Sequence, residues 1–166
     1  DEIKLVLLAS PPFFQDWINI ARWTGMRRIE LWQAHISHLN FKERYIFVPA
    51  SKSVNAREIP LERPALKILV RLAKKADKGF LFLREDGKRY KDPTSISKCF
   101  RELCRRAGVE NGVFHRLRHT AATKIANRGN LEDAQHILGH KNIQTTMTYV
   151  HVGETLRKSV KSLYED

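Results

Sequence analysis

The sequence contains little cysteine and no long apolar run. Its 2 cysteines among 166 residues are Cys99 and Cys104, and their spacing matches neither a metal-ligand pair nor a redox pair. A disulfide framework is therefore excluded, and we expect two reduced residues on a helix. The apolar stretch Leu5–Ala9 is too short to span a bilayer, and the acidic start at Asp1 and Glu2 is unlike a secretory signal. We expect a cytoplasmic protein that has no membrane partner.

Repeats, low-complexity stretches and linkers are also missing. No segment recurs at a solenoid period, and no biased stretch interrupts the chain. With 42% hydrophobic and 29% charged residues, the composition is that of an ordered globular protein. A chain of 166 residues can bury a hydrophobic core without disulfides or metals. The sequence therefore predicts a single domain over residues 1–166.

Negative charge is scarce relative to positive charge. The chain has 30 Lys and Arg against 18 Asp and Glu, which gives a formal net charge of +12 and a pI near 10.0. Such a surplus favours a polyanionic partner, because bound cations on that partner are released when the protein neutralises it. Nucleic acid, an anionic membrane and an acidic protein all satisfy this condition, and composition alone does not choose among them.

The pattern of apolar residues predicts a mostly helical fold with a small antiparallel sheet. Strand-forming residues separated by polar turns predict three strands, at Ile36–Leu39, Tyr45–Val48 and Ala56–Pro60. Apolar spacings of three and four, bounded by proline, glycine and capping residues, predict the helices. These are Ile3–Ala9, Pro12–Trp23, one beginning near Met26 or Arg27, one from Ala65 to the break at Asp77–Gly79, one from the Asp92 cap and Pro93 to Ala107, His115–Arg128, Leu131–Leu138, Ile143–Val150 and a tail helix after Gly153.

Positive charge is concentrated around the predicted helix His115–Arg128. A solvated helix face would explain such a run if it stood alone. However, His115 and Arg118 are three residues apart at the start of this helix and so share one face, with His119 beside them. The free N–H groups and positive dipole end of a helix N-terminus bind anions, so we predict a phosphate site here. The cations in this part of the chain are Arg101, Arg105, Arg106, Arg116, Arg118, Lys124 and Arg128.

Two residues near the C-terminal end also require explanation. His140 follows a predicted helix end, and Tyr149 comes nine residues later. Tyr149 could merely complete an apolar face with Ile143, Met147 and Val150. That interpretation gives no role to His140.

Four segments occur in a characteristic order, and their order carries the functional signal. They are Thr24–Arg27 with Glu30, Ser51–Lys52 ahead of Arg57–Leu61, His115–Thr120, and Leu138–His140 with Thr146–His151. In this order they resemble the catalytic domain of the tyrosine recombinases, also called phage integrases. The resemblance implies the DNA breaking-rejoining fold of that family, which is mostly α with a small three-stranded antiparallel sheet. It also implies a site-specific DNA recombinase or integrase.

The resemblance implies a set of site residues and no cofactor or metal. Guanidinium groups such as those of Arg27 and Arg118 donate to two phosphate oxygens at once and stay charged. Tyrosine has an ordinary pKa near 10, so the nucleophile needs a base, and His115 is the natural one. The catalytic set is Arg27, Lys52, His115, Arg118, His140 and Tyr149, with Glu30 supporting Arg27.

The implied reaction joins the protein covalently to DNA. Attack by Tyr149 leaves a 3′-phosphotyrosyl link and a free 5′-hydroxyl, so the bond energy is kept for religation. His140 would donate to a nonbridging oxygen, and Lys52 would protonate the leaving oxygen as general acid. Lys42 lies in the same region and competes with Lys52 for that role.

Two other interpretations remain open. A type IB topoisomerase has related chemistry and would relax supercoiled DNA without strand exchange. A noncatalytic DNA-binding regulator would use the helix near His115 to read a groove and would not need Tyr149. The spacing from His140 to Tyr149 and the Thr-rich run before Tyr149 favour the integrases.

The resemblance also implies partners and a second domain. It implies double-stranded DNA, self-association as a tetrameric synapse on DNA, and accessory DNA-bending proteins, in the nucleoid-associated cytoplasm of a prokaryote or phage host. Full-length members usually carry an N-terminal core-binding domain. We expect that these residues do not contain it and that they bind DNA weakly on their own. The tail residues Leu156, Val160 and Leu163 either dock on a neighbouring protomer or pack on their own domain.

Overall fold

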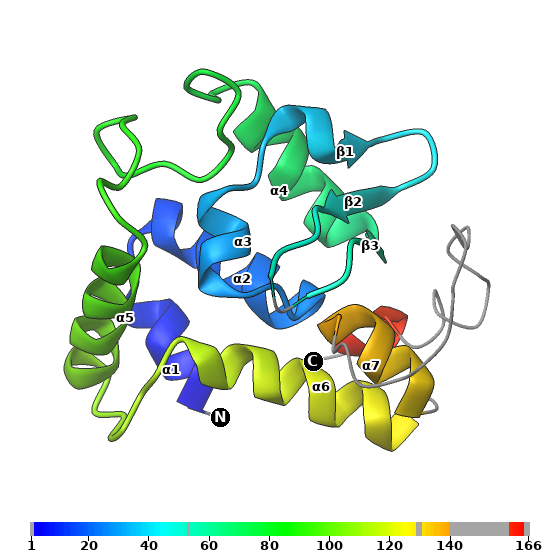
Figure 1. Ribbon diagram of the computed structural model, residues 1–166. Coiled ribbons are helices and arrows are strands. Elements are labelled where there is room, and N and C mark those ends of the chain that lie inside the picture. Colours follow the sequence, from blue (N-terminus) through cyan, green and yellow to red (C-terminus); the bar gives the residue numbers. More distant parts are fainter. Residues whose placement is uncertain (1, 53, 129–130, 140–159, 165–166) are drawn as a thin grey trace.

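The computed structural model describes residues 2–52, 54–128, 131–139 and 160–164 (Figure 1). These residues form a mostly helical domain with a three-stranded sheet in the order β1-β2-β3, which confirms the predicted fold class. The helices are α1 (Glu2–Ala9), α2 (Pro12–Thr24), α3 (Arg28–Trp32), α4 (Arg63–Ala73), α5 (Thr94–Arg106), α6 (His115–Arg128) and α7 (Leu131–Leu138), the strands are β1 (Leu39–Asn40), β2 (Tyr45–Val48) and β3 (Arg57–Pro60), and the 3-10 turns are η1 (Ile36–His38) and η2 (Ser162–Tyr164). The predicted helix Ile143–Val150 lies outside the described residues.

The prediction of a strand at Ile36–Leu39 is wrong. Residues Ile36–His38 form the 3-10 turn η1, and β1 begins only at Leu39. The turn is imposed by His35, whose Nδ1 accepts from the backbone N–H of Ser37 at 3.2 Å. The N–H of Ile36 donates to the carbonyl of Gly79 at 2.8 Å, a contact between distant segments. Local strand propensity therefore yields here to tertiary hydrogen bonds.

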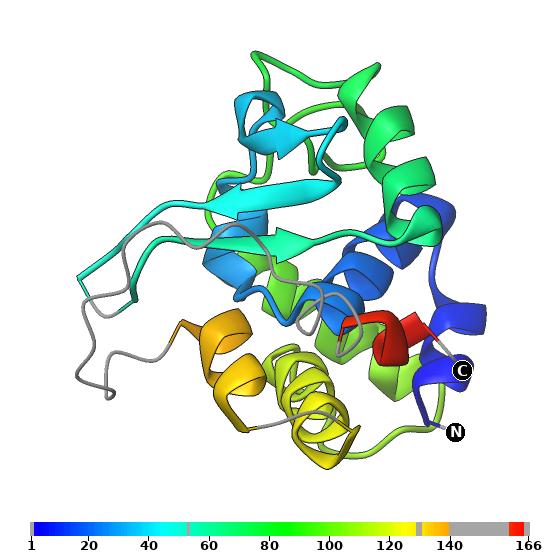
Figure 2. The ribbon, with the colours of Figure 1, turned by 90° about the vertical axis from the view of Figure 1, so that its right-hand side faces the viewer.

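The sheet has one buried face, and α4 follows directly from the end of β3 (Figures 1 and 2). Strands β2 and β3 are antiparallel, with Ile46 opposite Ile59 and Val48 opposite Arg57. Alternate residues of a strand share a face, so these four side chains point the same way. All four are buried. Three are apolar and belong to the core, and the fourth is an arginine.

The helices pack around α2, which contacts both α6 and α4. Trp17 of α2 is buried against Phe82 and Tyr90, with ring centroids 5.0 and 5.6 Å apart. At the side of the domain, α1 lies against α5 (Figure 1). Within the described residues, no helix is long and apolar enough to cross a bilayer.

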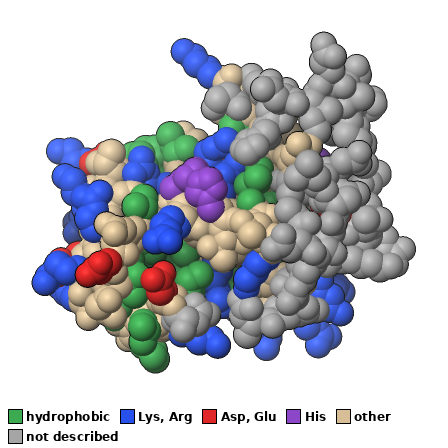
Figure 3. Space-filling view, turned by 90° about the horizontal axis from the view of Figure 1, so that it is seen from below, with side chains coloured by type: hydrophobic (Ala, Val, Ile, Leu, Met, Phe, Trp, Pro, Cys, Tyr) green, Lys and Arg blue, Asp and Glu red, His purple; other side chains and the backbone are tan. Residues whose placement is uncertain are grey.

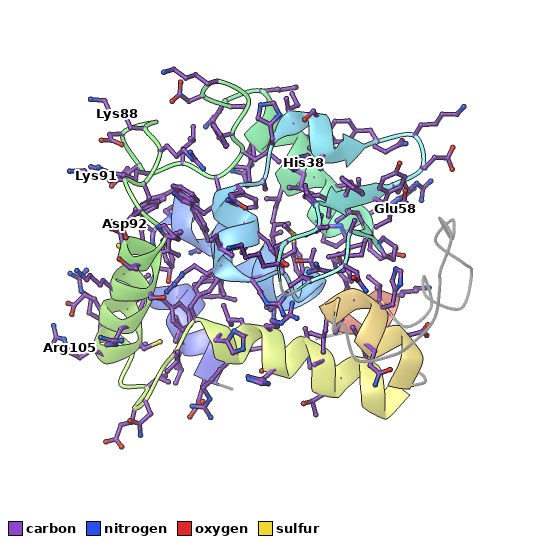
Figure 4. All side chains as sticks on the ribbon, viewed as in Figure 1. His38, Glu58, Lys88, Lys91, Asp92 and Arg105 are labelled. Carbon is purple, nitrogen blue, oxygen red and sulfur yellow. The ribbon has the colours of Figure 1, made fainter. Side chains whose placement is uncertain are left out.

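Helix α5 begins one residue later than the sequence predicts. Asp92 lies at the start of this helix (Figure 4), and its carboxylate accepts from the backbone N–H groups of Thr94 and Ser95 at 2.8 and 3.2 Å. These bonds satisfy donors that lack a partner within the helix. The N-cap residue is Pro93, however, so the prediction of Asp92 as the N-cap is wrong by one residue. The first residue of α5 is Thr94 rather than Pro93.

The described part of the tail packs on its own domain. Val160 and Leu163 are buried, and η2 contacts α6 and α2. Tyr164 stacks on Trp23, with ring centroids 4.8 Å apart. These contacts favour packing on the parent domain for this part of the tail, whereas Leu156 lies outside the described residues.

Candidate active site

The end of α2, the start of α3, β3, the start of α6 and the end of α7 meet on one side of the domain. Contacts join α2 with α6, α6 with α7, and α7 with β3. Gly25 ends α2 with a left-handed φ of 63°, a conformation that glycine adopts without strain. A Cβ at Gly25 would lie 3.5 Å from Ile137 and 3.6 Å from Ala121. The turn therefore brings the chain from α2 into α3 directly beside α6 and α7.

Arg118 of α6 joins these elements. Only 4% of the residue is exposed. Its Nη1 donates to the carbonyl of Gly25 at 2.6 Å, and its Nη2 donates to the carbonyl of Leu138 at 2.5 Å. Burial and the charges of Arg27 and Arg57 together lower the pKa of Arg118 to about 10, against the opposing charge of Glu30. The guanidinium therefore remains charged near neutral pH.

Arg27 lies immediately before α3 and is held by Glu30. The backbone N–H of Arg27 donates to Oε2 of Glu30 at 2.6 Å, and its Nη1 donates to Oε1 at 3.3 Å. The same carboxylate accepts two bonds from Arg57, at 3.0 and 2.8 Å. The side chain of Arg27 remains 25% exposed, against 10% for Glu30. Glu30 therefore fixes the backbone of Arg27 and leaves its guanidinium accessible.

The electrostatics of Glu30 follow from these neighbours. Burial by itself raises the pKa of Glu30, but the hydrogen bonds and charge of Arg57, the bond from the Arg27 backbone and the charge of Arg118 together hold it below the ordinary value of 4.5. The carboxylate is therefore ionised at neutral pH.

The lowered pKa of Glu30 predicts an acid-sensitive contribution to stability. A group whose pKa is lower in the folded than in the unfolded protein stabilises the fold above its unfolded pKa, and this contribution is lost as the pH falls through the folded pKa. Urea denaturation of wild type and Glu30→Gln should therefore show a difference in the free energy of unfolding near neutral pH that shrinks below pH 4.5. A variant of the exposed Glu110, Glu110→Gln, should follow wild type at every pH. A difference between Glu30→Gln and wild type that is independent of pH would contradict this assignment.

His115 begins α6 on the exposed side of the cluster. Its ring meets that of His119 edge to face, with centroids 4.8 Å apart. Partial burial lowers the pKa of His115, and the neighbouring His119, Arg118, Arg27 and Arg28 lower it further. The imidazole is therefore disposed to be neutral, as a general base must be. On the face seen from below, histidine side chains form a patch with Lys and Arg side chains beside it (Figure 3).

The other predicted site residues lie either in turns of the sheet or outside the described residues. Lys52 lies in the exposed turn between β2 and β3, which is closed by a bond from the N–H of Ser51 to the carbonyl of Val54 at 2.9 Å. Its competitor Lys42 lies in the other turn, between β1 and β2. His140 and Tyr149 lie outside the described residues. The structure thus brings together Arg27, Glu30, His115 and Arg118.

The sequence did not single out Arg57, which the structure places in this cluster through its bonds to Glu30. It had appeared only as a member of the segment that follows Lys52. A signal was nevertheless present, because Arg57 precedes the buried Ile59 by two residues in a predicted strand and so occupies an inward position. An arginine at an inward position requires an acidic or carbonyl partner.

Among the described residues, no group of three or more His, Cys, Asp and Glu is arranged to hold a metal ion. The absence of a cofactor from the reaction stays a prediction. The cluster is instead rich in fixed guanidinium donors, which suit an anion such as a phosphodiester.

The model of the phage integrase family matches residues 13–155. The chain belongs to the phage integrase family. It is 31% identical over 134 residues to the tyrosine recombinase XerA of Pyrococcus furiosus, covering 78% of this chain and 46% of that protein. It is 32% identical over 144 residues to the tyrosine recombinase XerC of Lactobacillus delbrueckii subsp. bulgaricus, covering 78% and 47%. The chain spans about half the length of the curated relatives it matches.

Solved structures of phage integrases and related recombinases share the fold. The crystal structure of XerA recombinase matches with a TM-score of 0.71 and 26% identity, over 100% of this chain and 62% of that one. The integrase of mycobacterium phage Brujita matches with a TM-score of 0.77 and 22% identity, over 98% and 55%. A lambda integrase tetramer bound to a Holliday junction matches with a TM-score of 0.70 and 22% identity, over 89% and 46%. The predicted family fold is confirmed.

Proposed function

We propose that this chain is the catalytic domain of a site-specific DNA recombinase or integrase that cleaves and rejoins strands through a 3′-phosphotyrosyl intermediate. The observation that carries the proposal is the meeting of Arg27, Arg118 and His115 at one site, from elements far apart in the sequence. Family membership supports the same assignment.

The two arginines provide a fixed electrostatic environment for a phosphodiester. The transition state of phosphoryl transfer carries its charge on equatorial oxygens, so preorganised donors lower its energy. A guanidinium has five N–H donors, and the carbonyls of Gly25 and Leu138 accept from two of those of Arg118. Arg27 adds an accessible guanidinium beside it. Together Arg27 and Arg118 form a binding site for one phosphate.

Proton transfer and attack fall to the other predicted residues. His115 accepts the proton of Tyr149 as the phenolic oxygen attacks phosphorus, the bond to the 5′ oxygen breaks, and Lys52 returns a proton to that oxygen. His140 donates to a nonbridging oxygen. Religation reverses these steps and needs no cofactor, because the phosphotyrosyl bond retains the energy of the cleaved one.

The partners are proposed from the net charge of the chain and from its related proteins. A net charge of +12 suits double-stranded DNA. We propose self-association as a tetrameric synapse, following the lambda integrase tetramer, and accessory DNA-bending proteins in the nucleoid-associated cytoplasm of a prokaryote or phage host. Residues 1–166 would act as one catalytic domain, and a second domain would also bind the DNA duplex.

The proposal is tested by trapping the covalent intermediate. Incubation with a nicked suicide substrate, from which the cleaved fragment diffuses away, should give a protein–DNA adduct attached through a 3′ phosphate. Peptide mapping should place the adduct on Tyr149. Recovery of the DNA without any adduct would favour a noncatalytic regulator.

A second assay separates recombination from relaxation. A plasmid that carries two target sites should yield exchanged products in the presence of a recombinase, whereas a type IB topoisomerase would relax any supercoiled plasmid without exchange. Relaxation of plasmids that lack a target site, with no recombinant product, would move the assignment to the topoisomerases.

A further inference from the structure

Arg57 occupies a core position of the sheet, yet its guanidinium faces the candidate site. It lies opposite Val48 on the buried face of β3, and only 1% of its side chain is exposed. A buried guanidinium costs free energy unless each donor finds a partner. The hydrogen-bond partners of Arg57 therefore indicate its role.

The donors of Arg57 reach two other elements. Nη1 and Nη2 form a fork on the two carboxylate oxygens of Glu30, at 3.0 and 2.8 Å. Nε donates to the carbonyl of Ile137, near the end of α7, at 2.6 Å. The next carbonyl along α7, that of Leu138, accepts from Arg118. One side chain on β3 thus connects the carboxylate that holds Arg27 with the helix end that holds Arg118.

The approach of α7 to Arg57 also depends on Gly139. This residue has a left-handed φ of 64°, and a Cβ on it would lie 2.5 Å from Val54 and 3.1 Å from Nη1 of Arg57. Only glycine lets the end of α7 come this close. The contact between β3 and α7 is therefore built around the Arg57 side chain.

We propose that Arg57 is a positioning residue for strand cleavage, which holds Arg27 through Glu30 and fixes the end of α7 beside Arg118. The proposal rests on the proposed function. Each of the three guanidinium nitrogens of Arg57 already donates to Glu30 or to Ile137, so its effect on cleavage is exerted through these partners. Because Glu30 bonds both arginines, a change at Arg57 alters the orientation of Arg27 without removing any group that contacts phosphate.

The charged surroundings of this pair define its pH behaviour. Glu30 is faced by Arg27 at the start of α3, Arg57 on β3 and Arg118 on α6. Arg57 is near His136 of α7, which is also near Asp133 and Glu58. Loss of Arg57 removes the strongest influences that lower the pKa of Glu30, so that pKa should rise.

A second buried carboxylate provides a matched control. Asp16 of α2 is gripped by Arg71 of α4 through the same type of fork, at 3.0 and 2.8 Å, and only 6% of its side chain is exposed. Loss of Arg71 removes a two-bond fork from a buried carboxylate, as loss of Arg57 does, although Glu30 keeps its bonds to Arg27. Arg71→Met therefore removes the same type of carboxylate fork, from a half-exposed arginine, without disturbing Arg27 or Arg118.

The first measurement is single-turnover cleavage of a suicide substrate at saturating DNA. Arg57→Met should cleave about 10- to 100-fold more slowly than wild type, since misplacing a reacting group by about 1 Å costs about 100-fold. Its dissociation constant for DNA should not change. The pH below which the cleavage rate falls should be higher than in wild type. Arg57→Lys should lie between Arg57→Met and wild type. Arg71→Met should cleave at the wild-type rate per folded molecule.

A double-mutant cycle identifies the route. If Arg57 acts through Glu30, then adding Arg57→Met to Glu30→Gln should slow cleavage little further, whereas independent structural damage would add. Cleavage by Arg57→Met equal to that by Arg71→Met, or fully additive losses in the cycle, would overturn the proposal.

The last measurement does not depend on activity. Carboxyl-carbon NMR should show a raised pKa for Glu30 in Arg57→Met, together with a shifted Nε–H resonance of Arg27, and neither change in Arg71→Met. If wild type forms no DNA adduct, the proposed function fails and these spectra still decide whether Arg57 positions Arg27. An unchanged Glu30 pKa and Arg27 resonance would overturn the positioning role even in an active recombinase.

Discussion

Replacement of Tyr149 by phenylalanine is expected to abolish the covalent adduct on a suicide substrate and to leave DNA affinity unchanged. The substitution removes one oxygen and preserves the ring, so the attacking atom is lost with little other change. We do not expect another hydroxyl to replace it, because attack requires a base and two phosphate clamps arranged around the attacking oxygen. The expected loss of cleavage is complete within the detection limit of a gel assay.

The control for this experiment is another tyrosine of the same chain. Tyr45 lies on β2, and Tyr45→Phe should form the adduct at the wild-type rate. Binding of both variants to intact duplex is measured by fluorescence anisotropy at one fixed salt concentration, since such affinities depend steeply on salt. An adduct of undiminished yield in Tyr149→Phe would reject the assignment of the nucleophile.

Arg118→Lys is expected to lower single-turnover cleavage by about 100- to 1,000-fold, the usual effect of removing one preorganised donor to a transition state. The lysine retains a positive charge, but its compact ammonium cannot reproduce the planar fork. It also cannot span the carbonyls of Gly25 and Leu138, which lie on different elements. One buried carbonyl loses its donor, which should lower the free energy of unfolding by about 1–3 kcal/mol.

The matched control is Arg116→Lys in the same helix. Arg116 is exposed and lies two residues before Arg118, so it projects from another side of α6. Both variants are compared by urea denaturation and by cleavage at saturating DNA. Equal cleavage rates for Arg118→Lys and Arg116→Lys would remove Arg118 from the phosphate site.

The predictable part of the site was the part that we propose to contact phosphate. Arg27, His115 and Arg118 stand in short segments whose order identifies the family, and the structure brings the three residues together. Their supports were less visible, because Arg57 acts through a carboxylate 27 residues away and a carbonyl 80 residues away. Such pairings depend on which elements pack together, and that information is spread over the whole sequence.

The fold shows the same division between local and distant causes. The capped start of α5 and the glycine-terminated α2 follow from nearby residues, and both were predicted, the start of α5 to within one residue. Segment Ile36–Leu39 was predicted incorrectly, because the bond between Ile36 and Gly79 crosses more than 40 residues of chain. No spacing rule within a short window contains that contact.

The stack of Tyr164 on Trp23 gives the protein an intrinsic optical signal. Indole emission depends on the polarity around the ring, and Trp23 is buried beneath a residue from the last described turn. If Tyr164 left the domain, Trp23 would meet water, whereas Trp17 would keep its cover of Phe82 and Tyr90. The emission spectrum during assembly on DNA would therefore distinguish a tail that stays on its own protomer from one that moves to another, without any added label.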